Sequence, residues 1–536
     1  MDVVGARVGR SLDEFGAPQA DVAWLLCDRH PVAHTALRVA EGLGAATTWS
    51  FGELAEASRR VAAVLADAGV GRGDRVATVM GKSTDLVAVA LGIWRLGAVY
   101  TPLFTAFARE AVGSRLTDAG VVLVVADDDQ LAKVPEGSWS VLVAGTDAPD
   151  GLRARAAAAD PGRITSVPVG GDAPLVHMFT SGTTGKPKGV VHPVRYIAGW
   201  QGYLEFGLGV GPQSIFWSAA DPGWAYGLYT AIVAPLAAGV PTILLRGGFS
   251  PETTWTVLRE LAVTDFAAAP TVYRGLLASA ALIPEGLALQ RLSSAGEPLT
   301  PEVNEWAARV LGLRVHDHYG QTELGMPIGF PHHPDLEVPV QNGAMGPALP
   351  GWTMTVLDED RDEPAPPGQP GRLAVAVAES PFMTFRGYVG GVGADRFRAD
   401  GAYFLTGDLA SIDSEGIIRF SSRDDDVIIM AGYRIGPFDI ESTLLRHPAV
   451  DECAVVAAPD EVRGEVVEAF VVLARGTVGS DALAAELQRW VKTEYAAHAY
   501  PRRVHFVDAL PKTPSGKIQR AQLRRDRAAE TGASSR

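Results

Sequence analysis

One short segment of the chain combines more hydroxyls, glycines and lysines than an ordinary polar turn. It is Phe179–Gly189 (FTSGTTGKPKG). Glycines let backbone N–H groups turn towards an anion, hydroxyls add donors, and lysines add positive charge. The segment therefore predicts a phosphate cradle formed by Thr180, Ser181, Gly182, Thr183, Thr184, Gly185, Lys186 and Lys188. It is not a Walker loop, because its glycines have the wrong spacing and Pro187 follows the first lysine.

Four further segments follow in the order that one enzyme family shows. They are SAGEP at Ser294–Pro298, HYGQTE at His318–Glu323, YFLTGD at Tyr403–Asp408 and PKTPSGK at Pro511–Lys517. Together with Phe179–Gly189 they resemble the signature motifs of the adenylate-forming superfamily, which contains acyl-CoA synthetases, luciferases and peptide-synthetase adenylation domains. The resemblance implies an AMP-forming ligase that uses ATP, Mg²⁺ and coenzyme A to activate a carboxylic acid.

The resemblance also implies a nucleotide site. Besides the phosphate cradle, ATP would be bound by Gly296, Glu297, Pro298, Tyr319, Gln321, Thr322, Asp408, Arg423 and Arg434. Asp408 is suited to accept hydrogen bonds from two ribose hydroxyls. Glu323 is suited to hold Mg²⁺, a hard cation that takes one or two carboxylates beside substrate phosphates. Outside the motifs, each acid would more simply be a surface or capping residue.

By the same resemblance, the catalytic residues are Lys517, Thr183 and Glu323. Lys517 lies in a turn-like stretch and would approach the α-phosphate region and the substrate carboxylate. Asp425 would be the pivot of a hinge, because the lysine must withdraw before a thiol can reach the acyl carbonyl. The coenzyme A passage would be lined by Ala431, Gly432 and Tyr433. Acetylation would remove the charge of Lys517, and this modification stays open.

The acid is predicted mainly from one glycine. The resemblance places the acyl pocket at Trp224, Ala225, Tyr226, Ala295 and Gly320, and the C-terminal stretch is most similar to medium-chain acyl-CoA synthetases. Acetate enzymes of the family carry a tryptophan immediately before Gln-Thr-Glu, where this chain has Gly320. A missing indole would leave room for several methylenes, each worth about 0.8 kcal/mol when buried. We therefore expect a medium-chain, branched or aryl acid, with acetate or propionate as the alternative.

Other functions stay open at this stage. The acyl-adenylate could be passed to a carrier protein, the enzyme could be oxidative in the manner of a luciferase, or the chain could be a non-catalytic nucleotide-binding regulator. The presence of both Lys517 and Glu323 disfavours the regulator. The pairs His316/His318 and His332/His333 could suggest a metal site, but they lack cysteines or a further histidine at ligand spacing.

The surrounding elements alternate between helices and strands. Ser50 and Glu53 form a capping-box signature before an apolar helical pattern, and strand-like runs such as Arg75–Met80 separate it from the helix expected at Thr84–Leu96. This alternation predicts an α/β fold with large multi-sheet architecture. We predict an N-terminal adenylation domain at residues 1–422, a hinge at 423–426, and a small mobile α+β C-terminal domain at 427–536 that carries the catalytic lysine.

Composition limits the remaining classes. A formal net charge of −15 disfavours nucleic acid as a partner, and a site for anions needs a local cluster of positive charge or of backbone N–H donors. The 2 cysteines exclude a disulfide framework, and with no signal-peptide pattern near the N-terminus they indicate the cytoplasm. The apolar run Ala231–Leu245 is broken by prolines and is predicted to be buried core, not a membrane span. Arg527–Arg536 is expected to be a frayed tail, and a homodimer stays open.

Overall fold

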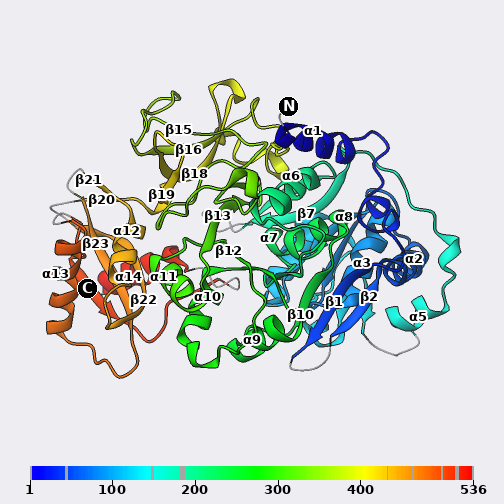
Figure 1. Ribbon diagram of the computed structural model, residues 1–536, viewed down its shortest axis with the longest axis horizontal. Helices are drawn as coiled ribbons and strands as arrows, with labels where there is room; N and C mark the ends of the chain where they lie inside the picture. Colours follow the sequence, from blue (N-terminus) through cyan, green and yellow to red (C-terminus); the bar gives the residue numbers. More distant parts are fainter. Residues whose placement is uncertain are drawn as a thin grey trace.

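Four β-sheets organise the part of the chain that the structure describes (Figure 1). This computed structural model describes residues 3–42, 46–145, 150–180, 187–430, 433–460, 464–496, 499–513 and 518–533. The predicted site residues outside these ranges are Ser181, Gly182, Thr183, Thr184, Gly185, Lys186, Ala431, Gly432 and Lys517. The side chains of Asp425, Tyr433 and Arg434 also lie outside the described part.

The largest sheet has eight strands in the order β14-β13-β12-β11-β9-β10-β1-β2. Their bounds are β1 Thr35–Glu41, β2 Thr47–Ser50, β9 Phe216–Ser218, β10 Thr242–Arg246, β11 Asp265–Ala268, β12 Arg291–Ala295, β13 Val315–Gln321 and β14 Gly325–Gly329. Neighbours are parallel except at the two edges, where β14 and β2 run antiparallel. Parallel strands end at a common edge, where α/β proteins bind ligands.

A second, six-stranded sheet has the order β6-β5-β3-β4-β7-β8. Its strands are β3 Arg75–Val79, β4 Val99–Pro102, β5 Val121–Asp127, β6 Ser140–Ala144, β7 Pro174–Thr180 and β8 Lys188–Pro193. Only the pair β7–β8 is antiparallel. These two mainly parallel sheets confirm the α/β fold class.

Two smaller sheets follow along the chain. The first contains β15 Met354–Leu357, β16 Gly371–Ala376, β17 Phe397–Arg398, β18 Tyr403–Ile412 and β19 Ile418–Arg423, all antiparallel. The second contains β20 Ile428–Met430, β21 Tyr433–Ile435, β22 Val450–Asp460, β23 Gly464–Leu473 and β24 Arg503–Phe506, and only β23–β24 is parallel. This last sheet and its helices form the orange and red end of the molecule (Figure 1). The domain limits at residues 422 and 426 stay a prediction.

Helices cover and connect the sheets. Their bounds are α1 Val3–Phe15, α2 Phe51–Asp67, α3 Thr84–Arg95, α4 Arg109–Ala119, α5 Leu152–Ala158, α6 Tyr196–Gly202, α7 Ala225–Leu228, α8 Ala234–Ala238, α9 Pro251–Glu260, α10 Pro270–Ala278, α11 Pro301–Val310, α12 Pro437–Leu444, α13 Asp481–Glu494 and α14 Arg520–Ala533. Within the described ranges, none of these helices has both the length and the apolar character needed to span a bilayer.

Local sequence signals agree closely with several of these elements. The Ser50 side chain accepts from the Glu53 backbone N–H, and the Glu53 carboxylate accepts from the Ser50 backbone N–H, so the predicted capping box begins α2. The predicted helix Thr84–Leu96 is α3, which is buried on all sides from Leu86 onwards. The expectation of a frayed tail at Arg527 is wrong as far as Ala533, because α14 continues to that residue.

Candidate active site

The proposed site forms at the carboxyl ends of β12 and β13. These strands are parallel neighbours, so the segments that follow them emerge at the same edge of the large sheet. Gly296 comes directly after β12 with a φ of +102°, a conformation that favours glycine. Glu297 Oε1 accepts a hydrogen bond from Thr271 Oγ1, and Glu297 Oε2 accepts one from Arg274 Nη2; both are 3.0 Å long. These contacts fix the turn between β12 and the Pro298 side of the predicted adenine segment.

Three predicted nucleotide residues meet at Asp408. This carboxylate comes from β18 in the third sheet, and its Oδ2 accepts from the Tyr319 hydroxyl and from Gln321 Nε2, the latter at 2.9 Å. Arg423 is the direct partner of Asp408 across β18 and β19. Burial raises the pKa of Asp408, while the Arg423 charge and the Tyr319 hydrogen bond act in the opposite direction. The tertiary structure thus brings two sequence motifs to one buried acid.

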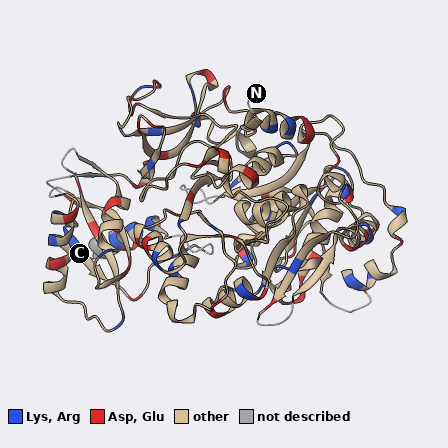
Figure 2. Cartoon of the chain, viewed as in Figure 1, with Lys and Arg blue, Asp and Glu red and all other residues tan. Residues whose placement is uncertain are grey.

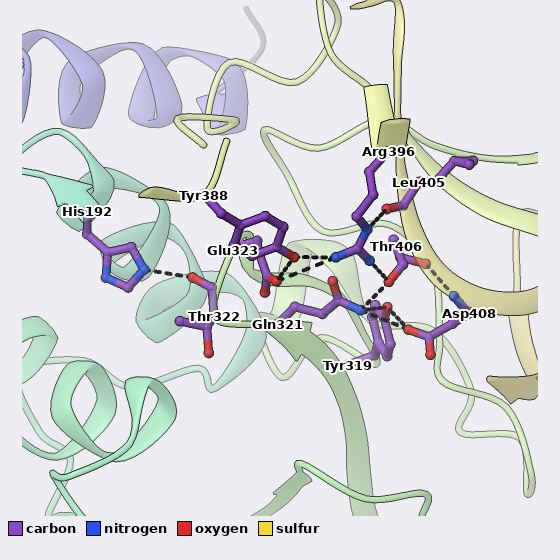
Figure 3. Close-up of polar contacts among 10 residues, drawn as sticks. All are labelled: His192, Tyr319, Gln321, Thr322, Glu323, Tyr388, Arg396, Leu405, Thr406 and Asp408. Atoms are coloured by element: carbon purple, nitrogen blue, oxygen red, sulfur yellow. Dashed lines mark hydrogen bonds and ion pairs between the residues drawn. The ribbon is translucent and has the colours of Figure 1, made fainter. Parts of the chain in front are cut away.

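Glu323 lies at the turn between β13 and β14 and is buried. Its Oε1 accepts a hydrogen bond from the Tyr388 hydroxyl and lies 3.5 Å from Arg396 Nη1 (Figure 3). Neither Tyr388 nor Arg396 was among the predicted site residues. No motif or spacing identifies them, because Tyr388 stands in a glycine-rich stretch and Arg396 in an ordinary charged one.

The preceding residue, Thr322, is fixed through its backbone. Its carbonyl oxygen accepts from the Tyr196 hydroxyl at 2.9 Å and lies 2.7 Å from His192 Nε2. His192 comes from the end of β8, just after the predicted phosphate cradle, and its ring stacks on Tyr196 at 4.1 Å. Sequence reasoning also missed this pair. It ties the strand that leaves the cradle to the turn that carries Glu323.

The ends of the phosphate cradle form a hairpin. β7 and β8 run antiparallel, and Thr180 pairs with Lys188. The Lys188 ammonium lies 5.0 Å from the centre of the Tyr388 ring, within cation–π range. The cradle therefore begins and ends next to the residue that contacts Glu323.

Positive charge is local in this acidic protein. Figure 2 shows Lys and Arg interspersed with Asp and Glu along the ribbon. At the site, Lys188 lies over Tyr388, Arg396 lies beside Glu323, and Arg423 pairs in register with Asp408. These cations are candidates for the positive charge that an anion site in this acidic chain could use.

The predicted acyl-pocket residues divide into two aromatic groups. Trp224 packs against Phe104 and Phe107 at 5.3 and 5.5 Å between ring centres. Tyr226, in α7 beside Ala225, lies 3.1 Å from the Tyr203 hydroxyl. Tyr226 packs against the main hydrophobic core, which contains the buried Ala295, whereas Trp224 and Phe179 pack against a separate, smaller cluster.

Gly320 has a packing role that its sequence context did not indicate. A Cβ at this position would overlap the Gly325 carbonyl oxygen and the Met326 Sδ. β14 therefore fills the Cβ side of Gly320 with its own backbone and with Met326. The missing indole does not by itself leave an open volume there, because the close approach of β13 and β14 replaces it.

The predicted hinge is tied to the C-terminal helix. Asp424–Asp426 form one turn of 3₁₀-helix, and the Asp426 carboxylate accepts from Arg524 Nη1 at 2.8 Å. Arg520, earlier on α14, donates to Glu441 at 2.7 Å and lies 3.8 Å from Asp426. The short bridge between Lys512 and Ile518 flanks the segment that contains Lys517.

The two histidines of β13, His316 and His318, and the nearby His332 pack in the interior. His316 Nδ1 and His318 Nε2 both lie 3.0 Å from the Phe330 carbonyl oxygen, and His332 Nε2 lies 3.1 Å from that of Leu292. Burial lowers the pKa of His316 to about 4, of His318 to about 3 and of His332 to about 2. One nitrogen of each ring therefore hydrogen-bonds the backbone, and His318 Nδ1 lies 2.7 Å from the Tyr203 hydroxyl.

Comparison with known proteins agrees with this geometry. The chain matches the family described as AMP-binding enzyme over residues 25–389, and the AMP-binding enzyme C-terminal domain over residues 439–517. It is 35% identical to acetyl-coenzyme A synthetase of Bacillus subtilis (strain 168), over 89% of this chain and 84% of the relative.

Solved structures share the fold over nearly the whole chain. An acyl-CoA synthetase of Brucella canis is 42% identical with a TM-score of 0.76, over 99% of both chains. A benzoate CoA ligase of Burkholderia xenovorans LB400 is 28% identical with a TM-score of 0.81, over 94% of this chain and 99% of that one. The chain therefore belongs to the AMP-binding enzyme family, and its fold and the motif residues around Asp408 and Glu323 agree with this.

Proposed function

We propose that this AMP-forming acid–CoA ligase activates a medium-chain, branched or aryl acid in a two-step reaction. The acid's carboxylate attacks the α-phosphate of ATP and pyrophosphate leaves. The thiolate of coenzyme A then attacks the acyl carbonyl and AMP leaves. The observation that carries the proposal is the meeting of Tyr319, Gln321, Glu323 and Asp408, from separate motifs, at one buried site beside Lys188.

Separate groups of residues are assigned to the ribose, the adenine and the phosphates of the nucleotide. Asp408 and Arg423 hold the ribose, since a buried carboxylate with a neighbouring cation can accept from two hydroxyls without repelling phosphates. The segment Gly296–Pro298 lies beside the adenine. Thr180–Lys188, with Thr183 within it, holds the phosphates, and Lys517 stabilises the charge that develops at the α-phosphate.

The donor set fits magnesium at Glu323. Among the residues that the structure describes, no group of three or more His, Cys, Asp or Glu could hold a metal on its own. A single buried carboxylate beside the phosphate cradle is the arrangement magnesium uses when it shares substrate phosphates and retains water. When bound, the ion would neutralise phosphate charge, and Glu323 would orient it.

The two half-reactions require the C-terminal part to move. We assign the pivot to Asp425, because the adjacent Asp426 joins the hinge to α14 and hence to the segment that follows Lys517. Ala431, Gly432 and Tyr433 line the passage for the pantetheine arm, and Arg434 faces its phosphate side. This assignment rests on the family resemblance together with the ion pairs of Asp426.

The acid is the least constrained assignment. The relatives named above act on acids that range from acetate to benzoate, according to their names. In this chain, Met326 occupies the space next to Gly320 and aromatic groups around Trp224 and Tyr226 form the other walls. Walls of this kind suit an apolar acyl group and discriminate only modestly between sizes, by about 1–3 kcal/mol per methylene.

One experiment tests the reaction and the acid together. Straight-chain acids from acetate to dodecanoate and aryl acids such as benzoate are scored by acid-dependent ATP–pyrophosphate exchange and by AMP release with and without coenzyme A. We expect hexanoate or an aryl acid to exceed acetate, and Lys517→Ala to lose exchange. Exchange without a free CoA-thioester product, together with loading of a carrier protein, would select the carrier-protein ligase instead.

We further place the enzyme in the cytoplasm. Cys27 and Cys453 are both free and buried, as expected for a protein that folds in a reducing compartment. Cell fractionation tests this location, and sedimentation tests the homodimer. Mass spectrometry of the purified enzyme tests acetylation at Lys517, which would remove the charge that adenylation requires.

A further inference from the structure

A tyrosine stands between an arginine and the carboxylate assigned to magnesium. The Tyr388 hydroxyl donates to Glu323 Oε1, and Arg396 Nη1 donates to the same hydroxyl oxygen (Figure 3). The direct separation of Arg396 Nη1 and Glu323 Oε1 is 3.5 Å. A charge-assisted hydrogen bond between such groups would be about 2.7–2.9 Å long. The two groups therefore form an ion pair, and the phenol keeps them from the closer, directly hydrogen-bonded contact.

Arg396 is anchored independently of Glu323. Its Nε donates to the Leu405 carbonyl oxygen at 3.0 Å, its Nη2 donates to that of Thr406, and its guanidinium lies over the Phe404 ring at 5.0 Å. The backbone of β18 thus fixes the position of the guanidinium. The same β18 segment carries Asp408.

The anchored arginine is part of a path between both ends of the nucleotide site. The Thr406 carbonyl oxygen that accepts from Arg396 also accepts from Gln321 Nε2 at 2.8 Å. Gln321 Nε2 lies 2.9 Å from Asp408 Oδ2. Hydrogen bonds therefore run from Glu323 through Tyr388, Arg396, the Thr406 carbonyl and the Gln321 amide to the acid assigned to the ribose (Figure 3).

Tyr388 also contacts the phosphate side. Its ring faces Lys188 Nζ at 5.0 Å. Glycines at 387, 390 and 391 with positive φ angles set the backbone that presents this residue. Three groups of the site thus depend on one side chain.

We propose that Tyr388 is a positioning residue that orients Glu323 and keeps Arg396 from hydrogen-bonding it directly, so that a divalent cation can still reach the carboxylate. The inference rests on the proposed role of Glu323 at magnesium. Without the hydroxyl, Arg396 would move from 3.5 Å to direct hydrogen-bond distance of Glu323, and a cation would have to displace it. Arg396 supports the arrangement by donating to the phenol and by linking it to β18.

The test is the magnesium dependence of Tyr388→Phe. We expect the magnesium concentration for half-maximal acid-dependent ATP–pyrophosphate exchange to rise about tenfold, the scale typical of residues that orient a metal ligand. AMP affinity measured by calorimetry in a chelator should stay within about twofold, because Asp408 is untouched. Removing the competing charge in Tyr388→Phe/Arg396→Gln should return the magnesium requirement to within about threefold of wild type.

Two matched variants separate positioning from general damage. Tyr100→Phe removes a buried tyrosine hydroxyl that hydrogen-bonds Thr78 at 2.8 Å, and Arg398→Gln removes a neighbouring arginine that pairs with Asp362 on the surface. Both should keep the wild-type magnesium requirement even if the melting temperature falls.

Each result has one meaning. An unchanged magnesium requirement in Tyr388→Phe, or a parallel loss of AMP affinity, would overturn the positioning role. A double variant worse than the single one would overturn the competition by Arg396. A wild-type enzyme without magnesium-dependent exchange would instead refute the proposed function and the role of Glu323.

Discussion

Substituting Asp408 by asparagine tests the proposed nucleotide site, because Asp408 is the buried acid assigned to the ribose. The substitution preserves the size of the side chain and removes its charge. In the wild-type protein Oδ2 accepts from the Tyr319 hydroxyl and from Gln321 Nε2. An asparagine must present its NH₂ group in place of one carboxylate oxygen, either to Gln321, which is also a donor, or to the ribose.

The expected loss follows from the hydrogen bonds that the charge supports. A hydrogen bond to a charged group contributes about 1.5–3 kcal/mol, roughly twice a neutral one. Two ribose hydroxyls bonded to one carboxylate would therefore lose about 2–3 kcal/mol when the charge is removed. This corresponds to a fall of about 30- to 150-fold in kcat/KM for ATP.

The assay compares ATP with 2′-deoxy-ATP in acid-dependent pyrophosphate exchange. Wild type should prefer ATP by at least about tenfold, because the 2′-hydroxyl bonds a charged acceptor. Asp408→Asn should show little preference for ATP over 2′-deoxy-ATP. The effects of the substitution and of removing the 2′-hydroxyl should therefore be strongly non-additive. This coupling distinguishes a direct ribose contact from a general loss of activity.

Stability should change in the opposite direction to activity. Burial raises the pKa of Asp408 above 3.8, so the folded protein disfavours the ionised form. The stability of wild type relative to Asp408→Asn therefore decreases as pH rises through the folded-state pKa. We expect the variant to melt no lower than wild type at pH 7 while its activity falls.

The result that would refute this reasoning is an Asp408→Asn enzyme that keeps the wild-type preference for ATP over 2′-deoxy-ATP. In that case the carboxylate would not contact the ribose, whatever happened to the rate. A preference lost together with a lower melting temperature would indicate structural damage and would equally contradict the assignment.

Three further predictions follow from other contacts. Burial opposes ionisation of Glu468, but hydrogen bonds from His505 and Arg527 outweigh this effect and lower the pKa of the carboxyl from 4.5 to about 2. At pH 7 the free energy of unfolding of wild type should therefore exceed that of Glu468→Gln by about 3 kcal/mol. Thermal melting measured at several pH values should show this difference disappearing as the pH falls from 4.5 towards 2. Arg524→Gln should lower the melting temperature by a few degrees by removing the 2.8 Å partner of Asp426, whereas the exposed neighbour Arg525→Gln should not. Met326→Ala should move the preferred acid towards longer chains in the acid panel, and an unchanged profile would exclude this side of Gly320 from the pocket.

Much of the architecture was predictable from local patterns. The capping box at Ser50, the buried helix Thr84–Arg95 and the strands around it are encoded by residues within one or two turns of each other. The alternation of helices and strands predicted the α/β fold, and the order of the motifs predicted the family; both are confirmed by the structure and the comparisons. These predictions agree with the structure because the features concerned depend on short, contiguous segments of sequence.

The site was predicted only in part. Tyr319, Gln321 and Asp408 were each identified by motif, but the hydrogen bonds that join them arise because β18 of one sheet meets β13 of another. Tyr388 and Arg396 carry no motif signal, and their contacts with Glu323 span 65 and 73 residues of sequence. At Gly320, sequence suggested a vacancy that packing of β14 fills.

The division has a physical cause. Periodicity and capping are short-range, so the amino-acid sequence by itself determined which segments are helices and strands and which motif residues could bind a nucleotide. Which oxygen faces which donor, and which side chain occupies the space beside a glycine, depends on how distant segments pack. Only the tertiary structure decided that Tyr388 separates Arg396 from Glu323.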